Sequence, residues 1–206
     1  MNIIERETLG EAWLQAMELA MKQGELIHDD GEELREVLNL YITLSDAREE
    51  DAVLVKYADK DRIALMKKKY STCGLVGDYK IDYGSYIFDN NGINQMDWVK
   101  KRIDNKPETK SATITLHRPG EDMLACLSLL DFKLRNGKLN MNVVYRSQNI
   151  FASQPGNIIA LRQMQSDLAE KIGVPTGKIE LVVFSAHIYA RDYEAVSRIL
   201  NKEALL

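Results

Sequence analysis

Three kinds of side chain in the second half of the chain could together hold and activate a nucleotide. Cys126 offers a thiol, the adjacent Arg146 and Ser147 offer donors for an anion, and Asn157 offers an amide. A thiolate is a nucleophile, a guanidinium and a hydroxyl suit a phosphate, and an amide can both donate to and accept from a base. This set of residue types indicates a nucleotide site with a covalent step.

An imidazole and a phenol follow further along the chain. His187 and Tyr189 lie two positions apart in a segment rich in strand-forming residues, so both side chains are expected on one face of a strand. A histidine on an apolar strand is more often a buried structural residue, and a lone cysteine is more often a small packed side chain. The interpretation therefore depends on the combination of these residues and not on any one of them.

A β-hairpin is expected to position the thiol and the anion-binding pair. Residues 125–135 and 138–147 are rich in strand formers, and Asn136-Gly137 between them is a signal for a two-residue turn. Pairing outward from this turn predicts that Phe132 lies across from Met141.

The same pairing predicts that Cys126 lies across from Ser147. Strict alternation along a strand would point Arg146 and Ser147 to opposite faces. If both bind one ligand, a bulge or a strand end must re-aim one of them.

The rest of the chain predicts mixed helices and strands. Thr8 and Glu11 form a capping box, and Asn157 is a possible N-cap of a helix that ends at Gly173. The expected helices run from Thr8 toward Gly24, from Asp59 to Tyr70, from Ile93 to Ile103, from Asn157 to Gly173 and from Asp192 to Asn201. Further strands are expected at residues 38–44, 112–116 and 178–188.

Composition is typical of a globular enzyme. The 206 residues are 45% hydrophobic and 28% charged with a net charge of −4, which gives no bias toward nucleic acid or membrane. No linker divides the chain, so we expect one domain over residues 1–206 in the cytoplasm. Cys73 and Cys126 lie far apart without metal-type partners, which argues against a disulfide framework and against a metal site.

Several short motifs resemble the folate-dependent thymidylate synthases and their pyrimidine hydroxymethylase relatives, in particular the short archaeal-type members. The resemblance covers roughly residues 80 to 192, and the order and spacing of the motifs make it specific. The motifs are Asp82-Tyr83-Gly84, Gln95, Ala125-Cys126, Asp131-Phe132, Asn136-Gly137-Lys138-Leu139, Arg146-Ser147, Pro155-Gly156-Asn157 and His187-Ile188-Tyr189.

The resemblance implies a fold and a reaction. The fold would be a single α/β (α+β) domain with a large mixed β-sheet flanked by helices, dimeric through sheet packing. The reaction would be C5 methylation of dUMP to dTMP, with 5,10-methylenetetrahydrofolate as donor of both the carbon and the hydride. Cys126 would add to uracil C6, since C5 is a poor nucleophile until that addition has occurred.

The resemblance also implies substrate contacts. Arg146 and Ser147 would bind the phosphate of a pyrimidine nucleotide monophosphate, and His187 and Tyr189 would hold the sugar hydroxyl. Asn157 would read the O4 and N3-H edge of the base, which favours uracil over cytosine.

Two further roles follow from the same resemblance. Tyr83 would lie near the proton removed from C5, and Asn149 stands where the family often has an aspartate that contacts folate and the water network. Other departures are Leu127 in place of a histidine, Ala125 in place of a proline and Tyr145 in place of a glutamine.

Two alternatives share these residues. In the first, water captures the exocyclic methylene intermediate, which makes the protein a pyrimidine nucleotide hydroxymethylase. In the second, the protein binds a nucleotide without turnover. The paired arginines that the family contributes across its dimer interface fall near Lys110 and Ser111, so one positive charge is retained.

Overall fold

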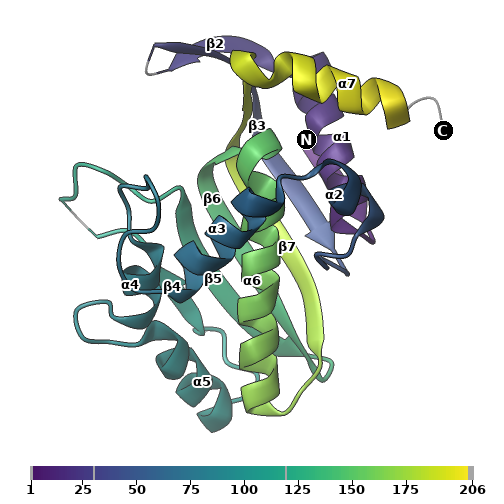
Figure 1. The fold of residues 1–206 in the computed structure, drawn as a ribbon. Helices are drawn as coiled ribbons and strands as arrows, with labels where there is room; N and C mark the ends of the chain where they lie inside the picture. Colours follow the sequence, from purple (N-terminus) through teal and green to yellow (C-terminus); the bar gives the residue numbers. More distant parts are fainter. Residues whose placement is uncertain (1, 30, 119, 204–206) are drawn as a thin grey trace.

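The computed structural model describes residues 2–29, 31–118 and 120–203 of the chain. Its centre is a mixed sheet in the order β1-β3-β7-β6-β5-β4, with β2 paired to β3 (Figure 1). β6 runs parallel to β7, and β5 runs antiparallel to β6. The strands are β1 (Asn2–Arg6), β2 (Glu25–Asp29), β3 (Glu32–Leu44), β4 (Thr113–Thr115), β5 (Leu127–Arg135), β6 (Lys138–Asn149) and β7 (Thr176–Tyr189).

Helices cover one face of this sheet, as expected. α6 packs on β6 and β7, α1 packs on β3, and α3 lies against α6 (Figure 1). The helices are α1 (Leu9–Gln23), α2 (Ala52–Tyr57), α3 (Lys60–Ser71), α4 (Tyr83–Phe88), α5 (Gln95–Asn105), α6 (Ile150–Ile172) and α7 (Tyr193–Glu203). The expected mixed sheet with flanking helices is confirmed.

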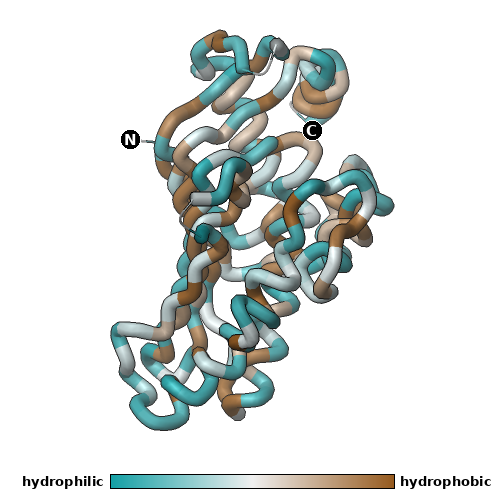
Figure 2. The backbone as a smooth tube through the Cα atoms, turned by 90° about the vertical axis from the view of Figure 1, so that its left-hand side faces the viewer, coloured by the Kyte–Doolittle hydropathy of each residue, from teal (hydrophilic) through white to brown (hydrophobic). Residues whose placement is uncertain are grey.

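Buried residues alternate with partly or fully exposed ones along residues 40–44 of β3 and 179–184 of β7. The side view of Figure 2 shows hydrophobic and hydrophilic stretches in turn along the backbone. Residues such as Leu40, Ile42 and Val183 are fully buried under the helices. On the other face of the same strands, Tyr41 is 37% exposed and Phe184 is 48% exposed. The sheet therefore has one packed face and one face with exposed apolar side chains.

The β5–β6 hairpin is confirmed, including its turn. Asn136 and Gly137 both have positive φ values, 51° and 70°, as a type I′ turn requires. Phe132 pairs with Met141 in the expected register.

The register shifts near the start of β5, and this overturns one prediction. Leu129 pairs with Val144 but Leu127 pairs with Tyr145, so Ser128 is an extra residue in a β-bulge. The backbone oxygen of Cys126, the residue before Leu127, accepts a hydrogen bond from the Arg146 backbone N–H at 2.9 Å.

The prediction that Cys126 lies across from Ser147 is therefore wrong, because the bulge adds one residue to a single strand. The bulge is in β5, whereas Arg146 and Ser147 lie on β6. The bulge therefore places Arg146, and not Ser147, opposite Cys126.

The start of α6 also differs from the prediction. The helix begins at Ile150, and the Asn149 side chain caps it by accepting the Ala152 N–H at 2.9 Å. Asn157 is therefore not the N-cap but lies inside the helix, two residues beyond the internal Pro155. Asn149 provides an earlier cap than Asn157, and the helix contains Pro155 within its length.

Four short elements were not predicted, namely β1, β2, α2 and α4. β1 buries only Ile4, and it forms because it pairs in parallel with β3. α4 has six residues and depends on the Asp82 side chain, which accepts the Ser85 N–H at 2.8 Å. Such elements depend on tertiary contacts more than on local pattern.

No helix within residues 2–29, 31–118 and 120–203 is long and apolar enough to cross a membrane.

Candidate functional site

The Cys126 thiol lies at one end of the sheet, where β5 begins and where β6 and β7 end. The Arg146 guanidinium donates from Nε to the Ala125 carbonyl at 3.1 Å and from Nη2 to the Leu124 carbonyl at 2.8 Å. The same Nη2 lies 4.0 Å from the Cys126 sulfur. Arg146 therefore holds the segment before the thiol and places a positive charge beside it.

A phenol fixes the thiol segment from the other side. The Tyr83 hydroxyl oxygen accepts the backbone N–H groups of Cys126 at 3.0 Å and of Leu127 at 3.2 Å. Burial raises the pKa of Tyr83, which keeps the phenol neutral. A Cβ at Gly84 would lie 1.9 Å from the Thr72 carbonyl oxygen, so a glycine is required for α4 to approach the end of α3 this closely.

A buried lysine joins this cluster. Lys69 is only 7% exposed, and its Nζ lies 3.7 Å from the centre of the Tyr79 ring and 3.9 Å from the centre of the Tyr83 ring. Burial lowers the pKa of Lys69 to about 8; attraction to Cys126 opposes this shift and repulsion from Arg62 adds to it.

Sequence reasoning missed Lys69, although a signal was present. In the predicted helix, Lys69 lies three residues after Met66 and six after Ile63, both of which are buried. That spacing places the lysine on the buried side of α3 and not among the solvent-exposed lysines beside it.

Three polar groups form a second, neutral network. The Tyr70 and Tyr145 hydroxyls lie 2.6 Å apart, and the Tyr70 hydroxyl donates to Asn157 Oδ1 at 3.3 Å. Burial raises the pKa of both tyrosines, so both stay neutral. Among the described residues Asn157 Nδ2 has no hydrogen-bond acceptor, so this donor remains available to a ligand.

The Tyr70 ring connects the two networks, because it meets the Tyr83 ring edge-on at a centroid distance of 5.2 Å. Tyr70 was not singled out from the sequence. Tyr145 was noted only as a departure, in place of a glutamine.

His187 and Tyr189 lie on the neighbouring strand β7. Their rings meet edge-on at 5.0 Å, as the two-residue spacing predicts. His187 Nδ1 lies 3.5 Å from the Ser185 hydroxyl, and burial lowers the pKa of His187, which favours a neutral imidazole at pH 7. The β6–β7 register places Asn149 beside His187 and Ser147 beside Ser185.

The expected site residues thus lie at the same end of the sheet, but they do not all touch. Cys126, Tyr83 and Arg146 are in direct contact, and Asn157 joins them through Tyr70. Asn149 uses its side-chain oxygen as the cap of α6. The exposed Lys110 lies in the loop before β4, outside this cluster of contacts.

Two cavities flank α3. One of about 270 Å³ lies between α3 and the first turns of α6, and its lining includes Arg62, Phe151 and Asp192. The Asp192 Oδ2 atom is buried and has no hydrogen-bond partner among the described residues, and burial raises the pKa of this carboxyl. This cavity therefore presents an unused acceptor.

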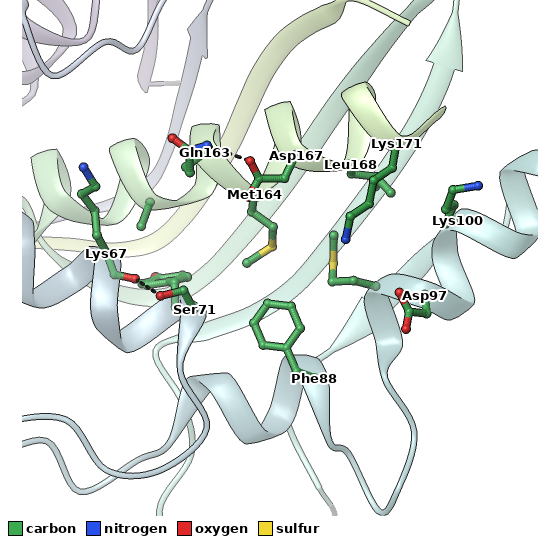
Figure 3. Close-up of a pocket in the computed structure, with 13 residues that line it drawn as sticks. Lys67, Ser71, Phe88, Asp97, Lys100, Gln163, Met164, Asp167, Leu168 and Lys171 are labelled. Carbon is green, nitrogen blue, oxygen red and sulfur yellow. Dashed lines mark hydrogen bonds between the residues drawn. The ribbon is translucent and has the colours of Figure 1, made fainter. Parts of the chain in front are cut away.

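The other cavity, of about 190 Å³, lies between α3, α5 and α6. Figure 3 shows Phe88, Met164 and Leu168 around its interior, with Lys67 and Lys171 at its margins. It shares Tyr70 with the network described above but contains none of the residues expected from the sequence.

The described part of the chain holds no group of three or more His, Cys, Asp or Glu side chains that could bind a metal ion.

Comparison with known proteins gives consistent results. Residues 36–205 match the family model described as thymidylate synthase. A protein named "Putative thymidylate synthase" from Methanosarcina barkeri is 26% identical over 97% of this chain and 95% of its own length. Its namesake from Methanothermobacter thermautotrophicus is 27% identical over 96% and 98%. The deoxyuridylate hydroxymethyltransferase of Bacillus phage SP01 is 30% identical over 55% of this chain and 31% of its own length.

Proposed function

Because the chain belongs to the thymidylate synthase family, we propose that it methylates dUMP at C5 to give dTMP. The observation that carries the proposal is the position of the Cys126 thiol, which lies between the Arg146 guanidinium and the Tyr83 phenol. A nearby cation favours the thiolate, and a fixed backbone holds the sulfur in a defined place.

The covalent step begins at C6 of the uracil ring. The Cys126 sulfur forms a bond to C6 while the π electrons of C5=C6 move toward O4, which makes C5 an enolate carbon. C5 would then bond to the one-carbon unit and lose its proton, while the bonds from that carbon to the folate nitrogens break and the nitrogens keep the electron pairs. Hydride addition to the exocyclic carbon would complete the methyl group as the C6–S bond breaks and the sulfur leaves as a thiolate. When bound, 5,10-methylenetetrahydrofolate supplies the carbon and the hydride.

The nucleotide would lie along the ends of β6 and β7. Arg146 Nη1 makes no hydrogen bond to a described residue, and together with the Ser147 hydroxyl it can bind the phosphate. Asn157 can donate from Nδ2 to uracil O4, and His187 and Tyr189 can hold the sugar hydroxyl.

Tyr83 has a role that differs from the first expectation. Its oxygen already accepts two backbone N–H groups, so it holds Cys126 in position. Its own proton remains available to donate to water or to the substrate near C5.

We propose that the pteridine ring of the folate co-substrate enters the cavity of about 270 Å³ beside the start of α6. A pteridine ring carries N–H donors, and the buried, unpartnered Oδ2 of Asp192 is an acceptor for them. Phe151 adds an aromatic surface to the same cavity, and Asn149 keeps its amide nitrogen free at the helix cap.

We propose a homodimer in which the exposed face of the sheet packs against a second copy. Tyr41 on β3 and Phe184 on β7 supply exposed apolar side chains on that face. Sedimentation should show a dimer for the wild type and a shift toward monomer for Phe184→Lys.

Hydroxymethylation is the second candidate, and the 30% identity to the phage deoxyuridylate hydroxymethyltransferase favours keeping it. The two reactions share Cys126 and the nucleotide contacts and differ in whether hydride or water meets the methylene intermediate. Nucleotide binding without turnover is the third candidate.

One assay separates the three. The protein is incubated with methylenetetrahydrofolate and each of dUMP, UMP, dCMP and CMP, and the products are identified by mass. Dihydrofolate with dTMP supports the synthase, and tetrahydrofolate with a hydroxymethyl nucleotide supports the second candidate. Binding without any product supports the third and rules out both reactions.

A further inference from the structure

Lys69 carries a positive charge into the interior without a counter-ion. Its side chain is 7% exposed, and no carboxylate of residues 2–29, 31–118 and 120–203 lies within 4.0 Å of its Nζ. Burial of an unpaired ammonium is unfavourable, because the charge loses its hydration. The folded chain must therefore compensate for this charge or use it.

The aromatic contacts compensate only in part. The ring centres of Tyr79 and Tyr83 lie 3.7 and 3.9 Å from Nζ, so both rings attract the charge through cation–π contacts. Arg62, about two helical turns before Lys69 on α3, adds repulsion while donating to the Tyr79 hydroxyl at 2.8 Å. An anion is still needed to balance the charge.

Cys126 is the neighbouring group that can supply that anion, because the Tyr83 ring beside Lys69 Nζ carries the hydroxyl that accepts the Cys126 N–H at 3.0 Å. The titratable and charged groups around Lys69 come from α3, the loop before α4, α4 itself, the residue before β5, and β6. They are Arg62, Tyr70, Tyr79, Tyr83, Cys126, Tyr145 and Arg146. Burial keeps Tyr70, Tyr83 and Tyr145 neutral, and the two arginines are cations, so a thiolate is the attractive partner.

Lys69 and Arg146 act on the thiol from different environments. Arg146 is exposed and already donates to the carbonyls of Leu124 and Ala125, so water and these dipoles weaken its field at the sulfur. Lys69 is shielded from water, and a charge in such an environment is screened less than an exposed one.

We propose that Lys69 is the buried counter-cation that holds Cys126 as a thiolate. It is a positioning residue that acts through the sulfur and is not assigned a contact with substrate. The inference rests on the proposed role of Cys126 as nucleophile. It adds a charge on α3 to a site whose other expected residues come from α4, α6 and strands β5 to β7.

Alkylation of Cys126 by iodoacetamide tests the proposal without any turnover. The thiolate displaces iodide from this neutral reagent, so the rate follows the thiolate fraction across pH. The exposed Cys73 is replaced by alanine throughout, and the modified Cys126 peptide is quantified by mass.

Lys69→Met should move the midpoint of the alkylation profile upward by about one to two pH units, since a close opposite charge typically shifts a titration by that much. Lys69→Gln should move the midpoint by the same amount, because it also removes the charge although it keeps a polar side-chain end. Lys69→Arg should return it toward the wild-type midpoint. Lys68→Met is the matched control, because Lys68 lies on the same helix but is exposed, and it should leave the midpoint unchanged.

A midpoint that stays at the wild-type value in folded Lys69→Met and Lys69→Gln would overturn the proposal. Circular dichroism and thermal melts establish that each variant is folded. A shifted midpoint in a protein that makes no product from dUMP would support Lys69 and reject the proposed reaction. An unshifted midpoint in a protein that does make dTMP would reject Lys69 and keep the reaction.

Discussion

At the thiol end of the site, Lys69 and Arg146 bring two positive charges to Cys126, whereas the base end contains only neutral hydrogen-bonding groups. The base end consists of Tyr70, Tyr145, Asn157, His187 and Tyr189. This division matches the chemistry of the proposed substrate, because the electron pair for the addition comes from the sulfur, while uracil and deoxyribose present uncharged edges. Changes at the thiol end should therefore alter rate and phosphate binding, and changes at the base end should alter selectivity.

The largest effect is expected for Cys126→Ala. Product formation and release of tritium from C5 of labelled dUMP should fall to background, because the covalent addition is lost. Equilibrium dialysis should still show nucleotide binding. Cys73→Ala, at the exposed cysteine, should retain wild-type activity, and substantial turnover by Cys126→Ala would remove Cys126 as the nucleophile.

Arg146→Ala should weaken the binding of dUMP by about 1.5–3 kcal/mol, which is the contribution of a charged hydrogen bond. The binding of deoxyuridine, which has no phosphate, should weaken much less. Isothermal titration with both ligands measures the difference. A thermal melt reports any loosening of the Leu124–Ala125 segment, which Arg146 also holds. Equal losses for nucleotide and nucleoside would refute the phosphate assignment.

The lowered pKa of Lys69 predicts a pH-dependent stability. In the unfolded chain Lys69 has the ordinary lysine pKa of 10.5, whereas in the folded protein its pKa is about 8. The unfolded state therefore binds more protons in this window, so the free energy of unfolding should rise with pH from 8 toward 10.5.

Relative to Lys69→Met, the wild type should gain about 2 kcal/mol between pH 7 and about 9.5, measured by urea unfolding. Effects of the buried tyrosines are common to both proteins and cancel in the difference. A constant difference across that range would show that Lys69 titrates normally.

The smallest effect is expected at the base end, for Asn157→Asp. A carboxylate cannot donate to uracil O4, so the ratio of kcat/KM for dUMP over dCMP should fall by about tenfold, the value of one hydrogen bond. The aspartate side chain can still accept the hydrogen bond from the Tyr70 hydroxyl, so the hydrogen bonds that join Tyr70, Tyr145 and position 157 should be kept. Asn149→Asp is the control, since both residues cap helices well and the ratio should not change.

The sequence predicted the hairpin because local signals were sufficient there. Asn136-Gly137 selects the type I′ turn, and alternation then sets the register as far as Leu129. The bulge at Ser128 could not be located from the sequence, and it lies on β5, whereas the distortion that the alternation of Arg146 and Ser147 called for concerns β6. No local pattern specifies where an extra residue will enter a strand.

The helix around Asn157 shows the same limit at an element boundary. The sequence predicted Asn157 as the cap, and Pro155 just before it agrees with that prediction, because proline is disfavoured inside a helix. The structure uses Asn149, where β6 ends against β7 and the chain must turn. The start of this helix is therefore set by tertiary geometry and not by the local signal.

Lys69 and Tyr70 were missed for a different reason. The helix from Asp59 to Tyr70 was predicted, but none of its residues was assigned to the site. The spacing from Met66 indicates that Lys69 is buried, yet only the fold shows that Tyr79 and Tyr83 from the following segment cover it. A pattern within one helix can show that a residue is buried but not which side chains surround it.

The bulge at Ser128 also bears on which kinds of genetic change the site can survive. Substitution of Ser128 changes one side chain, and deletion of Ser128 would still leave Leu127 opposite Tyr145 and Cys126 opposite Arg146, because Leu129 already pairs with Val144. A deletion between Leu129 and the turn would instead move Cys126 to another partner on β6, because that partner is set by the number of paired residues between the turn and Cys126. The start of β5 should thus tolerate many point mutations and the loss of Ser128, whereas the rest of the strand should tolerate few insertions or deletions.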